Sequence, residues 1–223
     1  MKRSDPSLKR SDPSTSSSTS TNDRTQPKKR AKLEPELTDH TLKKIISGGQ
    51  NGADLGGLKG GKSAGLKTGG TAPKDYKTRP KNVDIDSNSC DAGKQAAQEL
   101  IEYGLKQHTS SSYPPRSRSN VDNSDGTVAF KDPRITSWGT QLTITYAETG
   151  RWRGKKYSDT KPVLILSPRD KIVDNAEKLK AFILKNNIQT LNVAGQREHS
   201  CRGIEEHVSK VIQEAYKLCT LTH

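Results

Sequence analysis

The feature that most constrains this chain is the alternation of short apolar runs with longer stretches of helical periodicity. An apolar run of four to eight residues bounded by turn residues is typical of a buried strand, and a 3–4 spacing is typical of a helix. Strand–helix alternation favours a parallel sheet with helices on both faces. We expect strands at 42–47, 67–71, 127–130, 162–166 (fully buried) and 190–193, and helices at 53–65, 92–103, 139–149, 175–185 and 204–218.

The first 41 residues differ in composition from the rest of the chain. They contain three leucines but no Val, Ile, Phe, Trp or Tyr, and the six-residue unit KRSDPS occurs twice, at 2–7 and 9–14. Such a segment buries too little apolar surface to offset the entropy lost on ordering. We predict a disordered, basic and Ser-rich tail over 1–41 and one ligand-binding domain over 42–223.

The tail contains a dense basic cluster, Pro27-Lys28-Lys29-Arg30-Ala31-Lys32-Leu33. A compact basic cluster after a proline resembles a nuclear-localisation signal, which would recruit a nuclear import receptor. The same residues also fit a solvated basic tail that weakly attracts polyanions. The nucleus is therefore one expected location and the cytoplasm the other.

Two further observations predict an intracellular protein with no membrane partner. No run of about 18 apolar residues is present, and the N-terminus has no apolar core of a secretory signal. The three cysteines, Cys90, Cys201 and Cys219, form no CxxC pair. Their odd number favours reduced thiols and argues against a structural zinc site.

The charge of the domain indicates an anionic ligand. The whole chain carries a formal net charge of +13, of which the nine basic and six acidic residues of the tail supply +3. The remaining +10 belongs to residues 42–223. A basic domain favours a phosphate, a nucleotide or a nucleic acid as its partner.

Glycine-rich turns supply the candidate binding residues. In parallel sheets, ligands bind beyond the carboxyl ends of the strands, and glycines let backbone N–H groups approach an anion at a helix N-terminus. The segment 47–54 follows a strand and opens a helix, which makes it the main candidate. The other candidate turns lie at 124–127, 138–140 and 192–198, where Arg197 could contact an anion.

One sequence pattern matches a P-loop but is not expected to bind a nucleotide phosphate. Residues 56–63, GGLKGGKS, satisfy the P-loop pattern GxxxxGK[ST], which functions between a strand and a long helix. Here the preceding segment is too short for the strand, and glycines interrupt the segment that follows. We therefore do not expect a P-loop ATPase.

The turns taken together resemble those of the molybdenum cofactor carrier proteins. The matching blocks are IISGGQNGAD (45–54), GLKTGGTAPK (65–74), YGL (103–105), YPPRSRSNVDNSDGT (113–127), GTQLT (139–143) and LNVAGQRE (191–198). That family is part of a superfamily that includes the lonely-guy phosphoribohydrolases and DNA-processing protein A. The resemblance implies an α/β, Rossmann-like, doubly wound fold that often oligomerises, and a basic pocket for the phosphate-bearing molybdenum cofactor (molybdopterin).

The resemblance also implies which residues bind the cofactor. Two departures from the family pattern are Trp138 before Gly139 and the sequence GQREHS where the family often has GPRES. The implied cofactor-binding residues are Gly48, Gly49, Gln50, Gly52, Asp54, Lys74, Arg116, Asn120, Ser124, Asp125, Gly139, Thr140, Thr143, Gly195, Arg197 and Glu198.

Three functions remain open from the sequence. The first is a non-catalytic carrier of a phosphorylated small molecule, most specifically molybdenum cofactor. The second is an enzyme that acts on a nucleotide or its derivative, with Asp54 or Glu198 as the acid–base group; the glutamate of the phosphoribohydrolase motif is replaced by Thr143. The third is a nucleic-acid-associated protein, favoured by the +10 domain, although aromatic residues make up only 4% of the chain.

Overall fold

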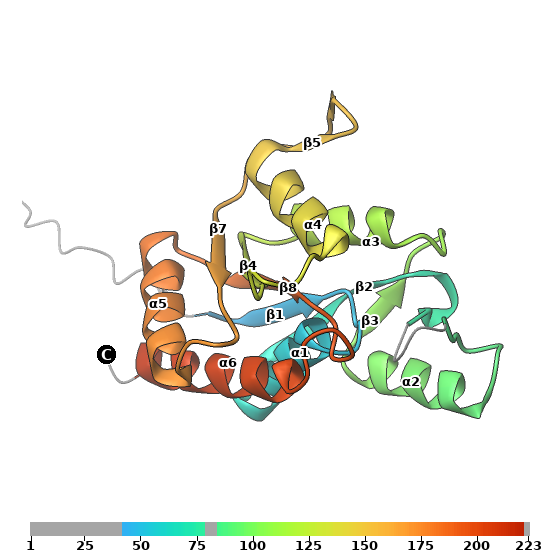
Figure 1. Ribbon diagram of the computed structural model, residues 1–223, viewed down its shortest axis with the longest axis horizontal. Coiled ribbons are helices and arrows are strands. Elements are labelled where there is room, and N and C mark those ends of the chain that lie inside the picture. The colour runs from blue at the N-terminus through green and yellow to red at the C-terminus, as the bar shows by residue number, and fades with distance from the viewer. Residues whose placement is uncertain (1–41, 79–83, 221–223) are drawn as a thin grey trace, which may run out of the picture. The chain divides into compact units, whose positions relative to one another are not determined.

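The computed structural model describes residues 42–78 and 84–220, which form a sheet with helices on both faces (Figure 1). The sheet has six strands in the order β3-β2-β1-β8-β4-β7, and every neighbouring pair is parallel. The predicted α/β, Rossmann-like, mainly parallel fold is confirmed. The strands are β1 (Lys44–Ser47), β2 (Lys67–Ala72), β3 (Leu105–Gln107), β4 (Gly126–Phe130), β7 (Val163–Leu166) and β8 (Thr190–Gly195).

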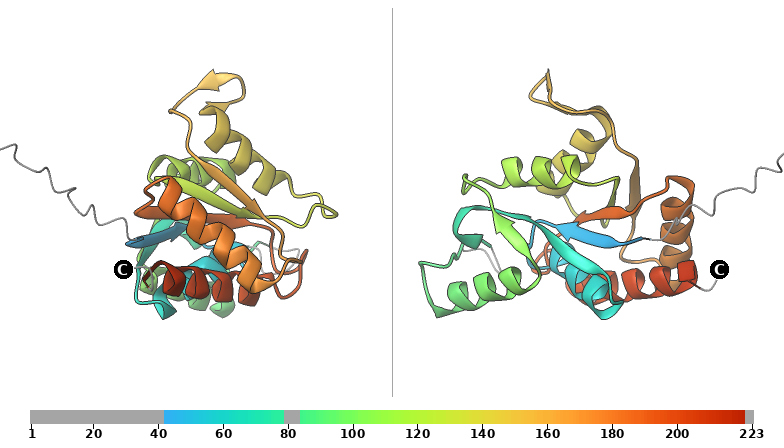
Figure 2. Two further views of the ribbon diagram at one scale, coloured as in Figure 1. Left: turned by 90° about the vertical axis from the view of Figure 1, so that its left-hand side faces the viewer. Right: turned by 180° about the vertical axis from the view of Figure 1, so that it is seen from behind.

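The helices form two layers (Figures 1 and 2). One face of the sheet is covered by α1 (Ala53–Ser63), α2 (Asp91–Glu102), α5 (Ile172–Lys185) and α6 (Ile204–Thr220). The other face carries α3 (Tyr113–Asp122) and α4 (Trp138–Thr149), which pack on each other. Since all strands are parallel, every strand ends at the same edge of the sheet, and that edge is where a ligand site is expected.

The main core lies between the sheet and the α1, α5 and α6 layer. It is formed by fully buried strand residues such as Val128 and Leu191 against helix residues such as Leu179 and Ile212. A smaller apolar cluster beneath α2 and another between α3 and α4 complete the packing. Burial of these side chains is the main stabilising contribution to the fold.

The glycines of the P-loop-like pattern serve helix packing. They lie within α1, where a Cβ at Gly56 or Gly60 would overlap the backbone of α6, and a Cβ at Gly57 would overlap Val193 of β8. Glycine costs about 1 kcal/mol relative to alanine in a helix interior. Here its lack of a side chain lets α1 approach both α6 and the sheet, and the pattern is therefore not a phosphate loop.

Five regions differ from the sequence-based expectation or extend it. The predicted full burial of 162–166 was wrong: β7 is an edge strand, and the Ile165 side chain is 50% exposed. Helix α3 was not predicted, nor were β3 and the antiparallel hairpin of β5 (Arg151–Trp152) and β6 (Lys155–Lys156). A short 3-10 helix, η1, spans Lys74–Tyr76.

Two further expectations concern the N-terminal tail and the absence of a membrane-spanning segment. The predicted tail, its KRSDPS repeats and the basic cluster 27–33 lie outside the described residues. Among residues 42–78 and 84–220, no helix combines the length and the apolar character needed to cross a membrane.

Candidate anion-binding cavity

A cavity of about 420 Å³ lies at the carboxyl edge of the sheet. Its walls come from the β1–α1 turn, from α3, from the first turns of α4 and from the end of β8. Its volume is within the range of small-molecule sites. It is lined by Gln50, Asp54, Tyr113, Pro114, Arg116, Ser117, Arg118, Asn120, Thr136, Ser137, Trp138, Gly139, Thr140, Leu142, Thr143, Tyr146, Trp152, Asn192, Val193, Ala194, Gly195, Arg197, His199 and Ser200.

The β1–α1 turn forms the floor of the cavity. Gly49 has a left-handed φ of 71°, and its N–H donates to the Ser47 hydroxyl at 3.2 Å. The same hydroxyl donates to the Asp54 carbonyl in the first turn of α1 at 2.9 Å. A Cβ at Gly48 would overlap the guanidinium of Arg116. The glycine at 48 therefore makes the space through which the arginine reaches the turn.

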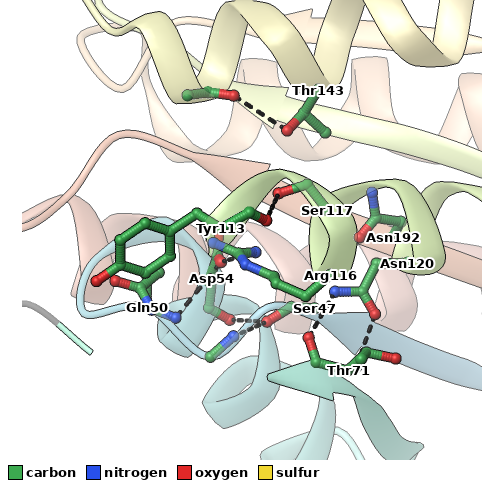
Figure 3. A network of polar contacts seen from close by, with 12 residues as sticks. Ser47, Gln50, Asp54, Thr71, Tyr113, Arg116, Ser117, Asn120, Thr143 and Asn192 are labelled. Atoms are coloured by element: carbon green, nitrogen blue, oxygen red, sulfur yellow. Dashed lines mark hydrogen bonds and ion pairs between the residues drawn. The ribbon is translucent and has the colours of Figure 1, made fainter. Parts of the chain in front are cut away.

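Asp54 and Arg116 form a nearly buried ion pair in this floor (Figure 3). Arg116 Nη1 lies 3.1 Å from Asp54 Oδ2, and the two side chains are 11% and 6% exposed. The Gln50 N–H also donates to Asp54 Oδ2. Burial raises the pKa of the Asp54 carboxyl above its usual value, although the charge of Arg116 acts in the opposite direction. Asp54 thus holds Arg116 in place while burial disfavours its own charged form.

Several buried polar atoms around the cavity have no hydrogen-bond partner within the described structure. They are Nε of Arg116, Nε of Arg118 and Oε1 of Gln50. Buried polar groups are nearly always hydrogen-bonded, to protein, water or a ligand. Two guanidinium donors without partners in one cavity wall are therefore the strongest structural indication of an anionic ligand.

Aromatic rings hold the cationic side chains around the cavity. The Tyr113 ring lies 5.9 Å from the guanidinium carbon of Arg116 and 5.1 Å from that of Arg197. Arg118 lies 5.4 Å from the Trp152 ring and 4.8 Å from the Tyr157 ring. Such cation–π contacts contribute about 0.5–1 kcal/mol each at exposed sites and more when desolvated. They orient three arginines without neutralising their charge.

The N-terminus of α4 supplies further donors. Trp138, Gly139 and Thr140 are the first three residues of this 12-residue helix and all line the cavity. The N–H groups of a first helical turn have no intrahelical acceptor, and the helix dipole adds partial positive charge there. Thr140 is held by Ser137, whose hydroxyl lies 2.7 Å from its Oγ1. Together with the arginines, this end of α4 suits a phosphate group.

The structure brings nine of the sixteen sequence-predicted binding residues to the cavity: Gln50, Asp54, Arg116, Asn120, Gly139, Thr140, Thr143, Gly195 and Arg197. Besides the pairs already described, two more of these residues have structural partners. The Asn120 side chain pairs with the backbone of Thr71 in β2, and the Thr143 hydroxyl donates to the Gly139 carbonyl (Figure 3).

Ser124 and Asp125 lie at the opposite edge of the sheet from the cavity. Their turn precedes β4, so it lies at the amino ends of the strands. Asp125 accepts from the N–H groups of Gln189 and Thr190, and the Ser124 hydroxyl donates to the Val121 carbonyl. A turn that enters a parallel strand cannot reach the edge at which the strands end.

The other five predicted residues lie near the cavity or outside it without lining it. Gly48 and Gly49 shape the turn, and Gly52 packs against the backbone of Gln196 with a φ of 113°. Lys74 is exposed in η1. Glu198 accepts from the N–H groups of Gly203 and Glu205 and so stabilises the beginning of α6.

The residues missed by sequence reasoning are mainly aromatic or lie on α3. Arg118 lies two positions after Arg116 in the unpredicted helix, and Trp138 was treated as a departure from a family pattern. Trp152 reaches the cavity from the β5–β6 hairpin, 14 residues after Trp138. The short basic-aromatic segment 151–157, RWRGKKY, was the one signal in the sequence that could have identified this wall.

The fold and the cavity define a Rossmann-like protein with a candidate ligand site at the carboxyl edge of its sheet. A family model described as the circularly permutated YpsA SLOG family matches residues 45–216, and the chain belongs to this family. The solved structure of a "putative molybdenum carrier protein" from Syntrophus aciditrophicus SB is similar to this chain, with a TM-score of 0.61 and 27% sequence identity. The match covers 79% of this chain and 95% of that protein. A search of curated proteins gives no match.

Proposed function

We propose that this protein binds and carries a phosphorylated anionic small molecule, most specifically molybdenum cofactor, without catalysing a reaction on it. The observation that carries the proposal is the pair of buried Nε atoms of Arg116 and Arg118 that lack partners within the described structure. A phosphate oxygen accepts readily from such donors. The name of the similar Syntrophus protein supports molybdenum cofactor as the specific ligand.

The residues that line the cavity fit the two chemical parts of this cofactor, its phosphate and its pterin ring. The phosphate would lie between Arg116, Arg118 and the N-terminus of α4. The pterin ring would lie against the aromatic side of the cavity, where Trp152 provides an apolar face. A metal-holding group of three or more His, Cys, Asp or Glu side chains is absent from residues 42–78 and 84–220.

Native mass spectrometry after anaerobic incubation with molybdenum cofactor tests the proposal. The wild-type protein should gain the mass of one cofactor, and the Arg118→Gln variant should lose most of this binding because a phosphate donor is removed. Arg202→Gln is the matched control, since Arg202 is exposed and does not line the cavity. Absence of any bound mass in the wild-type protein would refute the proposal.

The enzyme alternative is supported by one observation, the position of Asp54 in the cavity with a raised carboxyl pKa. Perturbed carboxyl groups in cavities are candidates for acid–base catalysis. Glu198 gives no such support because its carboxylate accepts from α6 backbone groups. Turnover of a nucleotide that disappears in Asp54→Asn would favour this alternative over the carrier.

A further inference from the structure

The β5–β6 hairpin projects beyond α4, away from the sheet (Figures 1 and 2). Four cations lie within six residues, Arg151, Arg153, Lys155 and Lys156, and all four are exposed. The only ion pair recorded for them in the described structure joins Lys156 to Asp159, and both of those side chains are largely exposed. This concentration of charge is not part of the cavity wall, apart from the neighbouring Trp152.

The hairpin has a defined conformation. Its tip residues, Arg153 and Gly154, have left-handed φ values of 49° and 80°. Two-residue hairpin turns of this kind favour asparagine followed by glycine, so an arginine at the first position is unfavourable for the backbone. The N–H of Tyr157 donates to the Gly150 carbonyl at the base of the hairpin. A cation is thus held at the tip in spite of its backbone cost, which indicates a role for the charge.

A groove of about 610 Å³ runs between the hairpin and the exposed side of α4. Arg151, Trp152 and Arg153 form its basic wall. Leu142, Thr145 and Thr149 form the helical wall and are exposed. Trp138 lies one helical turn before Leu142, and its side chain is 77% exposed. Leu142 borders both the groove and the neighbouring cavity, so the row of cations in the groove is followed by the exposed Trp138 of the cavity wall.

We infer that this groove is a binding site for single-stranded nucleic acid, with the phosphates on the hairpin cations and a base stacked on Trp138. Basic grooves that carry accessible aromatic side chains are the common design of sequence-tolerant single-strand binding. The positive charge of the domain complements the negative charge of the phosphates, since residues 42–223 carry a net +10. An acidic protein would also be attracted to the cations, but the exposed indole beside them offers the flat face on which a base stacks.

Anisotropy of a fluorescent single-stranded oligonucleotide, measured with the full chain over a range of salt concentrations, tests the inference. For single strands, the logarithm of the affinity falls with the logarithm of salt by about 0.7 per phosphate contact. Four hairpin contacts would contribute a slope of about −2.8, so affinity would fall about 50-fold between about 50 and 200 mM salt. The variant Arg153→Gln with Lys155→Gln should reduce the steepness of this slope by about 1.4.

A charge-matched control separates the hairpin from the basic N-terminal segment. The variant Lys28→Gln with Lys29→Gln removes the same charge outside the described residues and should weaken binding less than the hairpin variant. Trp138→Ala should weaken binding at least about five-fold, through the loss of one stacked base. The same substitution should have little effect on the affinity for an oligonucleotide with abasic sites, because that oligonucleotide has no base to stack.

Several results would overturn the inference. Equal affinity of the wild-type protein and the hairpin variant would exclude the groove as the site. Binding of polyglutamate as tight as that of the oligonucleotide would identify an acidic protein as the better partner. Cofactor loading of the hairpin variant is measured in parallel, so a failure of the nucleic-acid site is distinguishable from a failure of the carrier proposal.

Discussion

Replacing Arg116 by methionine should make the stability of the protein strongly dependent on pH. The substitution retains much of the apolar bulk but leaves the Asp54 carboxyl, 6% exposed, without its cation. Breaking a buried ion pair by removing one partner costs about 3–5 kcal/mol, and the open side of the cavity favours the lower end of that range. We therefore expect the free energy of unfolding to fall by about 3 kcal/mol at neutral pH.

The sign of the pH dependence follows from the direction of the pKa change. Burial already raises the pKa of Asp54 above its unfolded value, and the loss of Arg116 raises it further. A raised carboxyl pKa means that the folded state binds the proton more tightly. The contribution of Asp54 to the free energy of unfolding is then fully present below the pKa of this carboxyl in the unfolded chain, about 3.9. It is lost as pH rises through the pKa of the carboxyl in the folded protein, by up to about 1.4 kcal/mol per pH unit.

Urea denaturation between pH 4 and pH 8 measures this effect. The double variant Arg116→Met with Asp54→Asn has no charge to bury, so it should be more stable at pH 8 than the single variant and should lack the added pH dependence. A single variant that matches the wild type at pH 8 would refute the reasoning, because the two charges would then not be coupled.

Three further predictions concern other parts of the domain. Gly48→Ala should abolish ligand binding and lower the free energy of unfolding by up to about 3 kcal/mol, because its Cβ displaces the Arg116 guanidinium from its pair with the buried Asp54 carboxyl; calorimetric titration and urea denaturation measure the two effects. Glu198→Gln should lower the free energy of unfolding by about 1 kcal/mol in urea denaturation, because the carboxylate at the start of α6 is lost, and should leave ligand binding unchanged. Burial lowers the pKa of His207, whose Nε2 faces the Asn175 amide. The contribution of His207 to the free energy of unfolding should therefore be fully present above about pH 6.5 and should be lost as pH falls through the lowered pKa. Melting temperatures of His207→Gln between pH 5 and 7 should lack this component.

The parallel sheet could be predicted from sequence because its signals are local. The apolar run at 190–193 and the periodicity at 204–218 correspond to β8 and α6. Helix α3 was not predicted because its sequence, YPPRSRSNVD, has prolines at the second and third positions and contains one aliphatic residue, Val121. Proline is compatible with the first turn of a helix, and tertiary contacts to α4 provide the rest of its stability.

Among the turns proposed from the sequence as parts of the site, those that follow a strand line the cavity. The β1–α1 turn and the end of β8 reach the cavity because parallel strands end at a common edge. The turn at 124–127 contains the same residue types but enters β4, which places it at the other edge. The aromatic wall depends also on contacts between α3 and the hairpin, such as Arg118 with Trp152, which are distant in sequence and which the segment 151–157 does not by itself specify.

We propose that molybdenum cofactor binds in the cavity at the carboxyl edge, through the arginines of the cavity and the N-terminus of α4. Anomalous scattering from crystals grown anaerobically with the cofactor tests it most directly, because the molybdenum atom can be located without other density. We expect one molybdenum peak inside the cavity, with phosphate density within hydrogen-bond distance of Arg116 and Arg118. A peak elsewhere, or a cavity without either feature in cofactor-soaked crystals, would contradict it.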